Sequence, residues 1–477
     1  MTVQPPPLPK TNVKPILTHC LSINLVAILA STITARAAEL VVAPDREGRT
    51  VDMTKYGLGQ GGFTDQPMLA SHVDDLRQLK PQVIRLFVQE YYDLMPAKGR
   101  YNWQKLDREL ESIVATGARP MLCLCMKPPA LFPTVDEKLV HPTSYKDWDE
   151  FIEQFVRHVN TERKFGVEYW EIGNEVDIGE RGGCPYLFKP DDYLKYYTHT
   201  VQAILRADPK AKVGGPALGH YDDPIGDALL AHAAGGKAPL HFFSWHTYHN
   251  DPAVFQERIR DVKARIGKYP QLKGVETHVN EWNMSLDQIV PSPGFQPAFT
   301  LTVTRLMEDE GLTGANYYQI RDGYVEPATF ARFLSSPSVA EVTRFFNVLP
   351  IRLGLYDRHG RMRPTYFVFK MMAQLRGKQW KVSSTYAQLF GMAFESDTTL
   401  EILFWSFDQP DRIKPMGVAV RLGERVGKRY KLIRLNPASC TDNLDTEKAD
   451  VMTKFPDPLQ VQLEPYGIRW LTIEREN

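Results

Sequence analysis

Short apolar segments alternate with longer amphipathic ones from about residue 56 onward, and this alternation constrains the fold more than any other feature of the sequence. The apolar segments span residues 56–59, 83–87, 120–125, 167–172, 212–215, 242–246, 275–280 and 315–319. Between most of them lie helical patterns, such as residues 147–162, whose Phe and Val side chains share one face. Eight strand–helix units predict an α/β fold, a (β/α)8 TIM barrel. A doubly wound sheet is the alternative, but no glycine-rich phosphate loop follows the first strand.

The pattern changes after about residue 346. One more helical segment, residues 364–377, precedes short alternating strands at residues 400–408, 417–422, 429–436 and 467–474, which are typical of a β-sandwich. We therefore predict a barrel over residues 50–345. A small C-terminal β-sandwich with a linking helix is predicted over residues 346–477, and residues 39–49 supply it with a further strand.

Residues 1–38 have the pattern of a secretory signal peptide. Lys10 and Lys14 precede an apolar run that ends in small residues, so cleavage is expected near Ala37 or Ala38, with an uncleaved anchor as the alternative. The protein is then expected to be secreted or periplasmic, without stable membrane insertion once the signal is removed.

Charge and cysteine usage narrow the functional classes. The 57 basic and 57 acidic residues give a formal net charge of zero, so no electrostatic footprint for nucleic acid is present. The five cysteines form no CxxC pair or Cys/His cluster, so neither a zinc site nor a disulfide framework is indicated. No cofactor or metal is expected.

Two Asn-Glu pairs follow apolar strands, Asn174-Glu175 after the fourth and Asn280-Glu281 after the seventh. In a barrel, the carboxyl ends of the strands meet around one cleft, where catalytic groups lie. Two carboxylates flanking a cleft are the minimum apparatus for glycoside hydrolysis, because one protonates the leaving oxygen and the other stabilises or attacks the anomeric carbon.

A family resemblance is carried by the motifs YWEIGNE and VNEWNMS and by the segments YNWQKLD, GARPMLCLCMKPPALFP and FFSWHTYHND. The sequence resembles clan A glycoside hydrolases, most of all family 39, the β-xylosidase and α-iduronidase family. The resemblance implies double displacement with retention of configuration on a β-xyloside-like glycoside. Glu175 would be the acid/base and Glu281 the nucleophile that forms a glycosyl-enzyme intermediate. Asn174 would hydrogen-bond the sugar 2-hydroxyl.

Further site residues are implied by the same resemblance. Arg85, in VIRLF, would keep the nucleophile ionised. Either His246 or Tyr248 would contact Glu281, with His246 favoured, and His249 would line the cleft.

The eighth strand departs from the family pattern, because its run is NYYQIRDG. Tyr318 stands where a sugar-stacking Trp is expected, so the family's xylosidase specificity does not carry over directly. Trp282 and Trp245 flank motif residues and are candidates for the sugar pocket, with a structural role as the alternative.

Three other functions stay open. EIGNE and NEWN also resemble family 51 α-L-arabinofuranosidases, an endo-β-glycanase would use the same carboxylates, and a non-catalytic carbohydrate-binding barrel is the rival outside enzymes. The long loop at residues 176–192 weakly favours exo action by closing a pocket. The expected partner in every case is an oligosaccharide or a polysaccharide-derived glycoside.

Overall fold

A computed structural model describes residues 37–45, 47–61, 67–286, 292–423, 430–438 and 455–475. The predicted signal peptide therefore lies outside the described residues, except for its last two positions.

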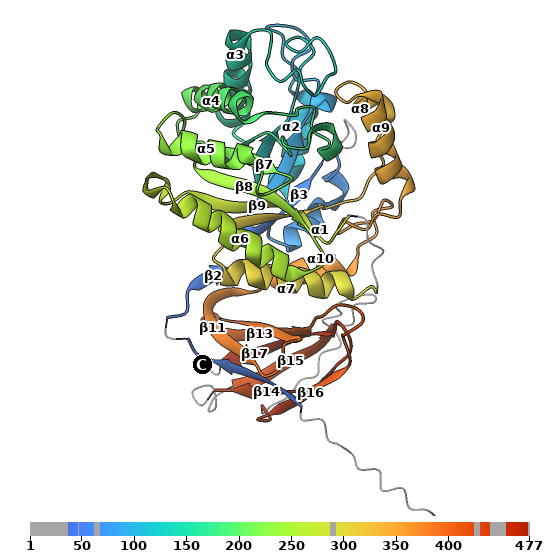
Figure 1. The fold of residues 1–477 in the computed structure, drawn as a ribbon. Coiled ribbons are helices and arrows are strands. Elements are labelled where there is room, and N and C mark those ends of the chain that lie inside the picture. Colours follow the sequence, from blue (N-terminus) through green and yellow to red (C-terminus); the bar gives the residue numbers. More distant parts are fainter. Residues whose placement is uncertain are drawn as a thin grey trace, which may run out of the picture. The chain divides into compact units, whose positions relative to one another are not determined.

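Eight parallel strands close into a barrel in the order β10-β3-β4-β5-β6-β7-β8-β9 (Figure 1). The predicted fold class is thus confirmed. The barrel strands are β3 (Tyr56–Gln60), β4 (Val83–Val88), β5 (Arg119–Leu124), β6 (Tyr169–Ile172), β7 (Lys212–Leu218), β8 (Phe242–Tyr248), β9 (Glu276–Asn283) and β10 (Gly314–Tyr318). Most of their residues are buried, since one face fills the barrel interior and the other is covered by helices.

Helices surround the barrel. They are α1 (Val73–Gln78), α2 (Gln104–Ala115), α3 (Tyr145–Val156), α4 (Pro190–Ala207), α5 (Pro224–Ala234), α6 (Pro252–Gly267) and α7 (Phe295–Asp309). Local sequence sets where several of them begin. Ser144 accepts from the backbone of α3, and Asp223 and Asp251 do the same for α5 and α6, each followed by Pro at the first helical position.

The chain after β10 forms an additional segment before it reaches the linking helix α10 (Pro364–Met372). This segment, residues 327–348, contains α8 (Pro327–Phe330), α9 (Ser336–Thr343) and the π-helical turn η7 (Arg344–Val348). We call it the cap segment, because several of its side chains line the cavity at the carboxyl ends of the strands.

The remaining strands build the C-terminal sandwich, in the order β15-β17-β13-β12-β11-β1-β14-β16, with β2 paired to β11. They are β1 (Ala38–Ala43), β2 (Thr50–Asp52), β11 (Arg376–Ser384), β12 (Leu389–Glu395), β13 (Thr399–Ser406), β14 (Met416–Leu422), β15 (Tyr430–Ala438), β16 (Leu459–Leu463) and β17 (Ile468–Arg475). β11 pairs with β12 at one end and with β1 at the other, so it joins the two layers. Their core holds Leu40 and Val420 opposite Ile402 and Ile473.

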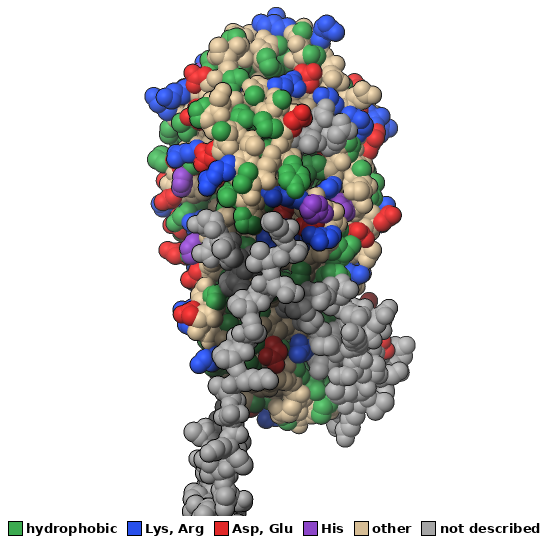
Figure 2. Space-filling view, turned by 90° about the vertical axis from the view of Figure 1, so that its right-hand side faces the viewer, with side chains coloured by type: hydrophobic (Ala, Val, Ile, Leu, Met, Phe, Trp, Pro, Cys, Tyr) green, Lys and Arg blue, Asp and Glu red, His purple; other side chains and the backbone are tan. Residues whose placement is uncertain are grey.

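The surface carries both charge signs. On the face in Figure 2, Lys and Arg side chains are interspersed with Asp and Glu, as the zero net charge suggests. None of the helices in the described part of the chain combines the length and the hydropathy needed to cross a membrane.

Candidate active site

The first Asn-Glu pair follows a sharp break at the end of β6. Glu171 of this strand faces the barrel interior, whereas Trp170 packs outward against Phe155 of α3. Gly173 then adopts φ +91°, and a Cβ there would lie 2.4 Å from Val176. Glu175 itself has φ +45°, a strained conformation for a residue with a side chain, and such strain concentrates at functional sites.

The second pair lies on an irregular part of β9. Val279 pairs with Trp245 of β8, but Glu281 pairs with the very next residue, His246, so β9 carries one extra residue between them. Such a bulge re-aims side chains. Here it turns both Asn280 and Glu281 toward the barrel interior.

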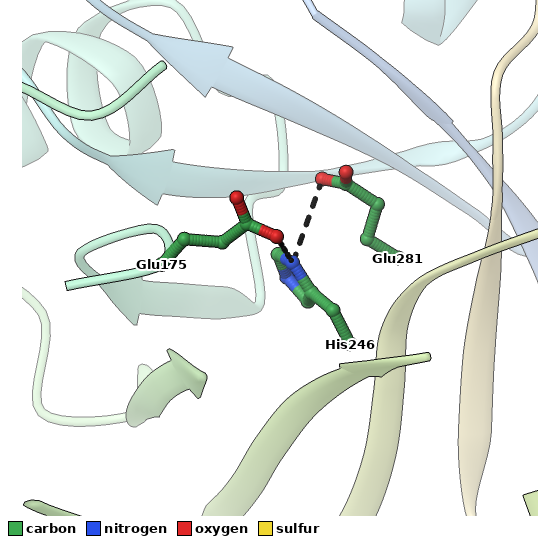
Figure 3. A group of neighbouring side chains, drawn as sticks. All are labelled: Glu175, His246 and Glu281. Carbon is green, nitrogen blue, oxygen red and sulfur yellow. Dashed lines mark hydrogen bonds and ion pairs between the residues drawn. The ribbon is translucent and has the colours of Figure 1, made fainter. Parts of the chain in front are cut away.

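The two carboxylates of the Asn-Glu pairs meet across the mouth of the barrel, with an imidazole between them (Figure 3). One oxygen each of Glu175 and Glu281 and one ring nitrogen of His246 all lie within 4.8 Å of one another. His246 Nδ1 is 2.9 Å from Glu175 Oε1 and 3.9 Å from Glu281 Oε2. The structure thus brings together the two glutamates that the sequence analysis singled out.

Arg85 of β4 organises the floor of this site. Its fully buried guanidinium donates to Glu171 at 2.6 Å, to Glu281 at 3.2 Å and to Asn174 Oδ1 at 2.7 Å. Asn174 lies beneath the cavity, and its Nδ2 is directed to the carbonyl of Gly182 at 3.4 Å. A buried Arg held by several acceptors is a fixed positive charge beside the carboxylate of Glu281.

Sequence reasoning missed Glu171, although the signal was present as a carboxylate inside an apolar strand. Besides Arg85, Glu171 accepts hydrogen bonds from Ser244 of β8 at 2.7 Å and from Asn280. Burial alone would raise the pKa of Glu171, but Arg85 and these donors hold it below its usual value. Glu171 is therefore an anion that supports Arg85.

Glu175 and Glu281 occupy different electrostatic environments. Burial, reinforced by the nearby carboxylate of Asp177, raises the pKa of Glu175 to about 8, so Glu175 holds a proton at neutral pH. Burial also raises the pKa of Glu281, but the charge of Arg85 and a hydrogen bond from Tyr248 oppose that rise. The pair is thus separated into a protonated acid and a carboxylate supported by donors.

The hydrogen bond to Glu281 corrects the sequence interpretation, which favoured His246. The donor is the hydroxyl of Tyr248, whereas His246 makes its shorter contact with Glu175. His246 and Tyr248 are two residues apart on β8 and so lie on the same face of the strand, but His246 is 3.9 Å from the nearer oxygen of Glu281. Burial lowers the pKa of His246, which leaves its imidazole neutral at pH 7.

The other predicted residues divide between the cavity and the core. Tyr318 lines the cavity. His249 does not line it, because its Nδ1 accepts from the backbone of Asp251 at 2.9 Å. Trp282 is fully buried and packs on Phe255 and Tyr317, outside the barrel interior.

The cavity above the carboxylates has an empty volume of about 950 Å³, part of it open to solvent, which is within the usual range for small-molecule sites. Its described polar lining includes Gln89, Glu180, Arg181 and Glu341, none of which the sequence singled out. They come from separate segments, with Glu341 on α9 and Arg181 in the turn after β6, and the convergence of such segments has no local sequence signal.

A divalent cation is disfavoured at this position. Glu175, His246 and Glu281 have the identity and spacing of metal ligands. However, the guanidinium of Arg85 already lies 3.2 Å from Glu281, and a second positive charge there would be repelled.

The closed parallel barrel, with buried carboxylates at its fourth and seventh strands, has the architecture of the barrel-type glycoside hydrolases. Within that class, the chain belongs to glycosyl hydrolases family 39, whose sequence profile matches residues 60–406.

Two curated relatives are β-xylosidases. The protein from Caldicellulosiruptor saccharolyticus is 23% identical over 314 residues, 59% of this chain and 58% of its own length. The protein from Geobacillus stearothermophilus is 26% identical over 226 residues, 41% of this chain and 43% of its own. The chain thus spans about half the length of the curated relatives it matches.

Solved structures share the fold. A monomeric β-xylosidase from Caulobacter crescentus CB15 superposes with a TM-score of 0.70 at 17% identity, covering 92% of this chain and all of that one. The GH39 enzyme from Xanthomonas axonopodis pv. citri gives 0.70 at 19% identity, covering 94% and 100%. A glucosidase from Croceicoccus marinus gives 0.69 at 17% identity, covering 92% and 100%.

Proposed function

We propose that this protein is a retaining exo-glycosidase that hydrolyses a β-xyloside-like glycoside. The observation that carries the proposal is a pair of carboxyl groups in different electrostatic environments, with oxygens of Glu175 and Glu281 within 4.8 Å of each other. Retaining glycosidases need carboxyl groups about 5–5.5 Å apart, because one of them attacks the sugar directly instead of through a water.

In this mechanism Glu281 attacks the anomeric carbon while Glu175 gives its proton to the leaving oxygen, so the glycosidic C–O bond breaks as a glycosyl ester forms. Glu175, now ionised, removes a proton from water, which attacks the same carbon and releases Glu281. Arg85 and Tyr248 stabilise the ionised form of Glu281 before it attacks, and again when water releases it from the ester.

Exo action is supported by how the cavity is walled. Glu180, from the loop after β6, accepts hydrogen bonds from the backbone of Ser335 at 3.0 Å and from the hydroxyl of Ser338 at 2.6 Å. This contact, which we call the Glu180 latch, joins the loop to the cap segment and closes one side of the cavity. An endo-acting glycanase would need an open groove there.

Export follows from the same proposal. A glycosidase acting on extracellular glycans needs access to them, and the leader-like residues 1–38 would provide it by directing the chain out of the cytoplasm.

Hydrolysis of nitrophenyl glycosides tests the proposal, with the β-xyloside, β-glucoside, β-galactoside and α-arabinofuranoside compared on wild type, Glu175→Gln and Glu281→Gln. We expect one sugar to be cleaved, and both variants to lose at least about 100-fold in kcat/KM. The first-formed anomer, followed by NMR, should keep the substrate's configuration. A preference for the α-arabinofuranoside would replace the β-xyloside assignment, and full activity in Glu281→Gln would contradict the mechanism.

A further inference from the structure

Much of the lining of this cavity is apolar among the described residues. We call the side chains of Leu286, Phe330, Val342, Phe345, Phe346 and Leu353, which all line it, the apolar wall. Four of these six belong to the cap segment. From this wall we propose that the substrate carries a hydrophobic aglycone, an alkyl or aryl alcohol, in place of a second sugar. The inference rests on the proposed function, because it concerns the same cavity.

The position of the cap segment identifies which part of the substrate it meets. Glu175 protonates the leaving oxygen in the proposed reaction, so the aglycone must lie on the side of Glu175. The Glu180 latch starts five residues after Glu175 in the same loop and ends on Ser335 and Ser338 at the start of α9. The cap segment therefore flanks the acid, where the aglycone leaves.

A π-helical turn places two rings side by side in this wall. The backbone N–H of Leu349 donates to the carbonyl of Arg344, five residues earlier, at 3.1 Å. Phe345 and Phe346 lie within this turn, with ring centroids 5.0 Å apart, and both line the cavity. Single π turns are rare and concentrate at functional sites, which fits a turn that presents consecutive aromatic residues to one ligand.

The polar side chains nearest this wall already have protein partners. Gln89 Nε2 donates to the carbonyl of Gly183 at 2.7 Å, and the latch uses the carboxylate of Glu180. Arg181 and Glu341 are exposed at the rim. A sugar in this space would lose hydrogen bonds to water that these partnered side chains do not replace, whereas an apolar group would lose none on entering.

The wall is held in place by polar ties outside the cavity. Asn347 exchanges two hydrogen bonds with the backbone of Val325, at 2.8 and 2.9 Å, and Arg332 pairs with Asp93 at 2.9 Å. A preorganised apolar surface binds an apolar ligand without an ordering cost. Covering that surface removes it from water, which favours binding.

The test is a homologous substrate series on the sugar that the nitrophenyl panel selects: the glycosyl fluoride, the methyl, butyl and hexyl β-glycosides, and the disaccharide. Fluoride occupies no aglycone site, and the alkyl alcohols are leaving groups of similar reactivity. We expect kcat/KM to rise from methyl to hexyl, by up to about fourfold per buried methylene. The hexyl glycoside should exceed the disaccharide at least tenfold.

Phe345→Ala should reduce the ratio of kcat/KM for the hexyl glycoside to that for the methyl glycoside by at least fivefold. Its kcat/KM for the glycosyl fluoride should stay within about twofold of wild type. Val348→Ala is the matched control, because Val348 lies in the same turn, is 71% exposed and does not line the cavity. The Val348→Ala variant should keep the wild-type ratio of kcat/KM between the hexyl and methyl glycosides. A flat series in the wild type, or a preference for the disaccharide, overturns the proposal.

A binding measurement separates this inference from the proposed reaction. Hexyl and methyl 1-thio-β-xylosides, which resist hydrolysis, are titrated into the wild-type protein by calorimetry. The hexyl compound should bind at least 30-fold more tightly, and equal affinities overturn the inference whatever the protein hydrolyses. If the glycosyl fluoride is inert while the hexyl preference persists, the proposed function fails and the apolar site remains.

Discussion

Asn280 and Glu281 are neighbours in the sequence, yet both side chains face the interior of the barrel. Asn280 donates to Glu171, and Glu281 accepts from Arg85. In a regular strand one of the two would point outward. The bulge between β8 and β9 turns them both inward, so the proposed nucleophile and the amide that supports its surroundings come from consecutive positions.

The hydroxyl of Tyr248 is the second donor to Glu281, and Tyr248→Phe removes it while keeping the ring. A hydrogen bond to a charged group is worth about 1.5–3 kcal/mol, so kcat/KM should fall by about 10- to 100-fold. The lower limb of the pH–rate profile should also move to higher pH, because the ionised form of Glu281 loses a stabilising donor.

Tyr197→Phe is the control for this change, since its hydroxyl donates to the carbonyl of Pro239 at 2.8 Å and does not line the cavity. It should leave the pH–rate profile of nitrophenyl glycoside hydrolysis unaltered. An unshifted acidic limb in Tyr248→Phe would show that the tyrosine does not support the ionised carboxylate.

The barrel could be predicted from the sequence because its parallel strands are buried on both faces and so appear as nearly continuous apolar runs. β11 could not, since its sequence RGKQWKVSS buries only Trp380 and reads as a polar loop. The cap segment was missed for another reason. α8 has only four residues, and nothing in a local pattern shows that such a segment returns over the cavity.

The two catalytic candidates, Glu175 and Glu281, could be predicted because each follows an apolar strand, and strand ends converge in a barrel. Their partners depend on register and side-chain length, which the sequence does not display. The bulge at Asn280 and the reach of Tyr248 are examples. Glu171 was predictable, because a charged residue inside an apolar strand needs a buried partner, and Arg85 stands in another such strand.

Glu171→Gln should show how much the barrel depends on this support. The change removes the negative charge that pairs with the buried Arg85 at 2.6 Å, and breaking a buried pair costs about 3–5 kcal/mol of the free energy of unfolding. Glu168→Gln, at a partly exposed ion pair with Lys212 just before β6, should cost about 0–1 kcal/mol. Urea unfolding measures the free energy of unfolding of both variants. Equal losses would show that Glu171 does not stabilise the barrel more than a partly exposed ion pair does.

Adjacent glycines provide a test of how Glu175 is positioned. A Cβ on Gly182 would lie 2.1 Å from Glu175 Oε2, so Gly182→Ala must displace the acid. We expect hydrolysis of alkyl glycosides to fall by at least about 100-fold, since poor leaving groups need protonation. Dinitrophenyl glycosides should be much less affected.

Gly183→Ala controls for the backbone. A Cβ there meets nothing within 4 Å, but the φ of +73° makes the substitution cost about 1 kcal/mol of stability. Its selectivity between alkyl and dinitrophenyl glycosides should equal that of the wild type. The same selectivity in both alanine variants would mean that strain in the loop, and not contact with Glu175, causes the loss.

The raised pKa of Glu175 also predicts how stability depends on pH. Glu175 has a pKa of about 8 in the folded protein, against about 4.3 for an unfolded glutamate. Between these values the unfolded chain releases the proton that the folded protein keeps, so stability falls as pH rises, by at most about 1.4 kcal/mol per pH unit. Gln carries no such proton. The gain in free energy of unfolding of Glu175→Gln over wild type should therefore be smallest near pH 4, grow through pH 6, and level off above pH 8. Urea titrations at these values measure it, and a constant difference at every pH would contradict the protonated acid on which the proposed mechanism depends.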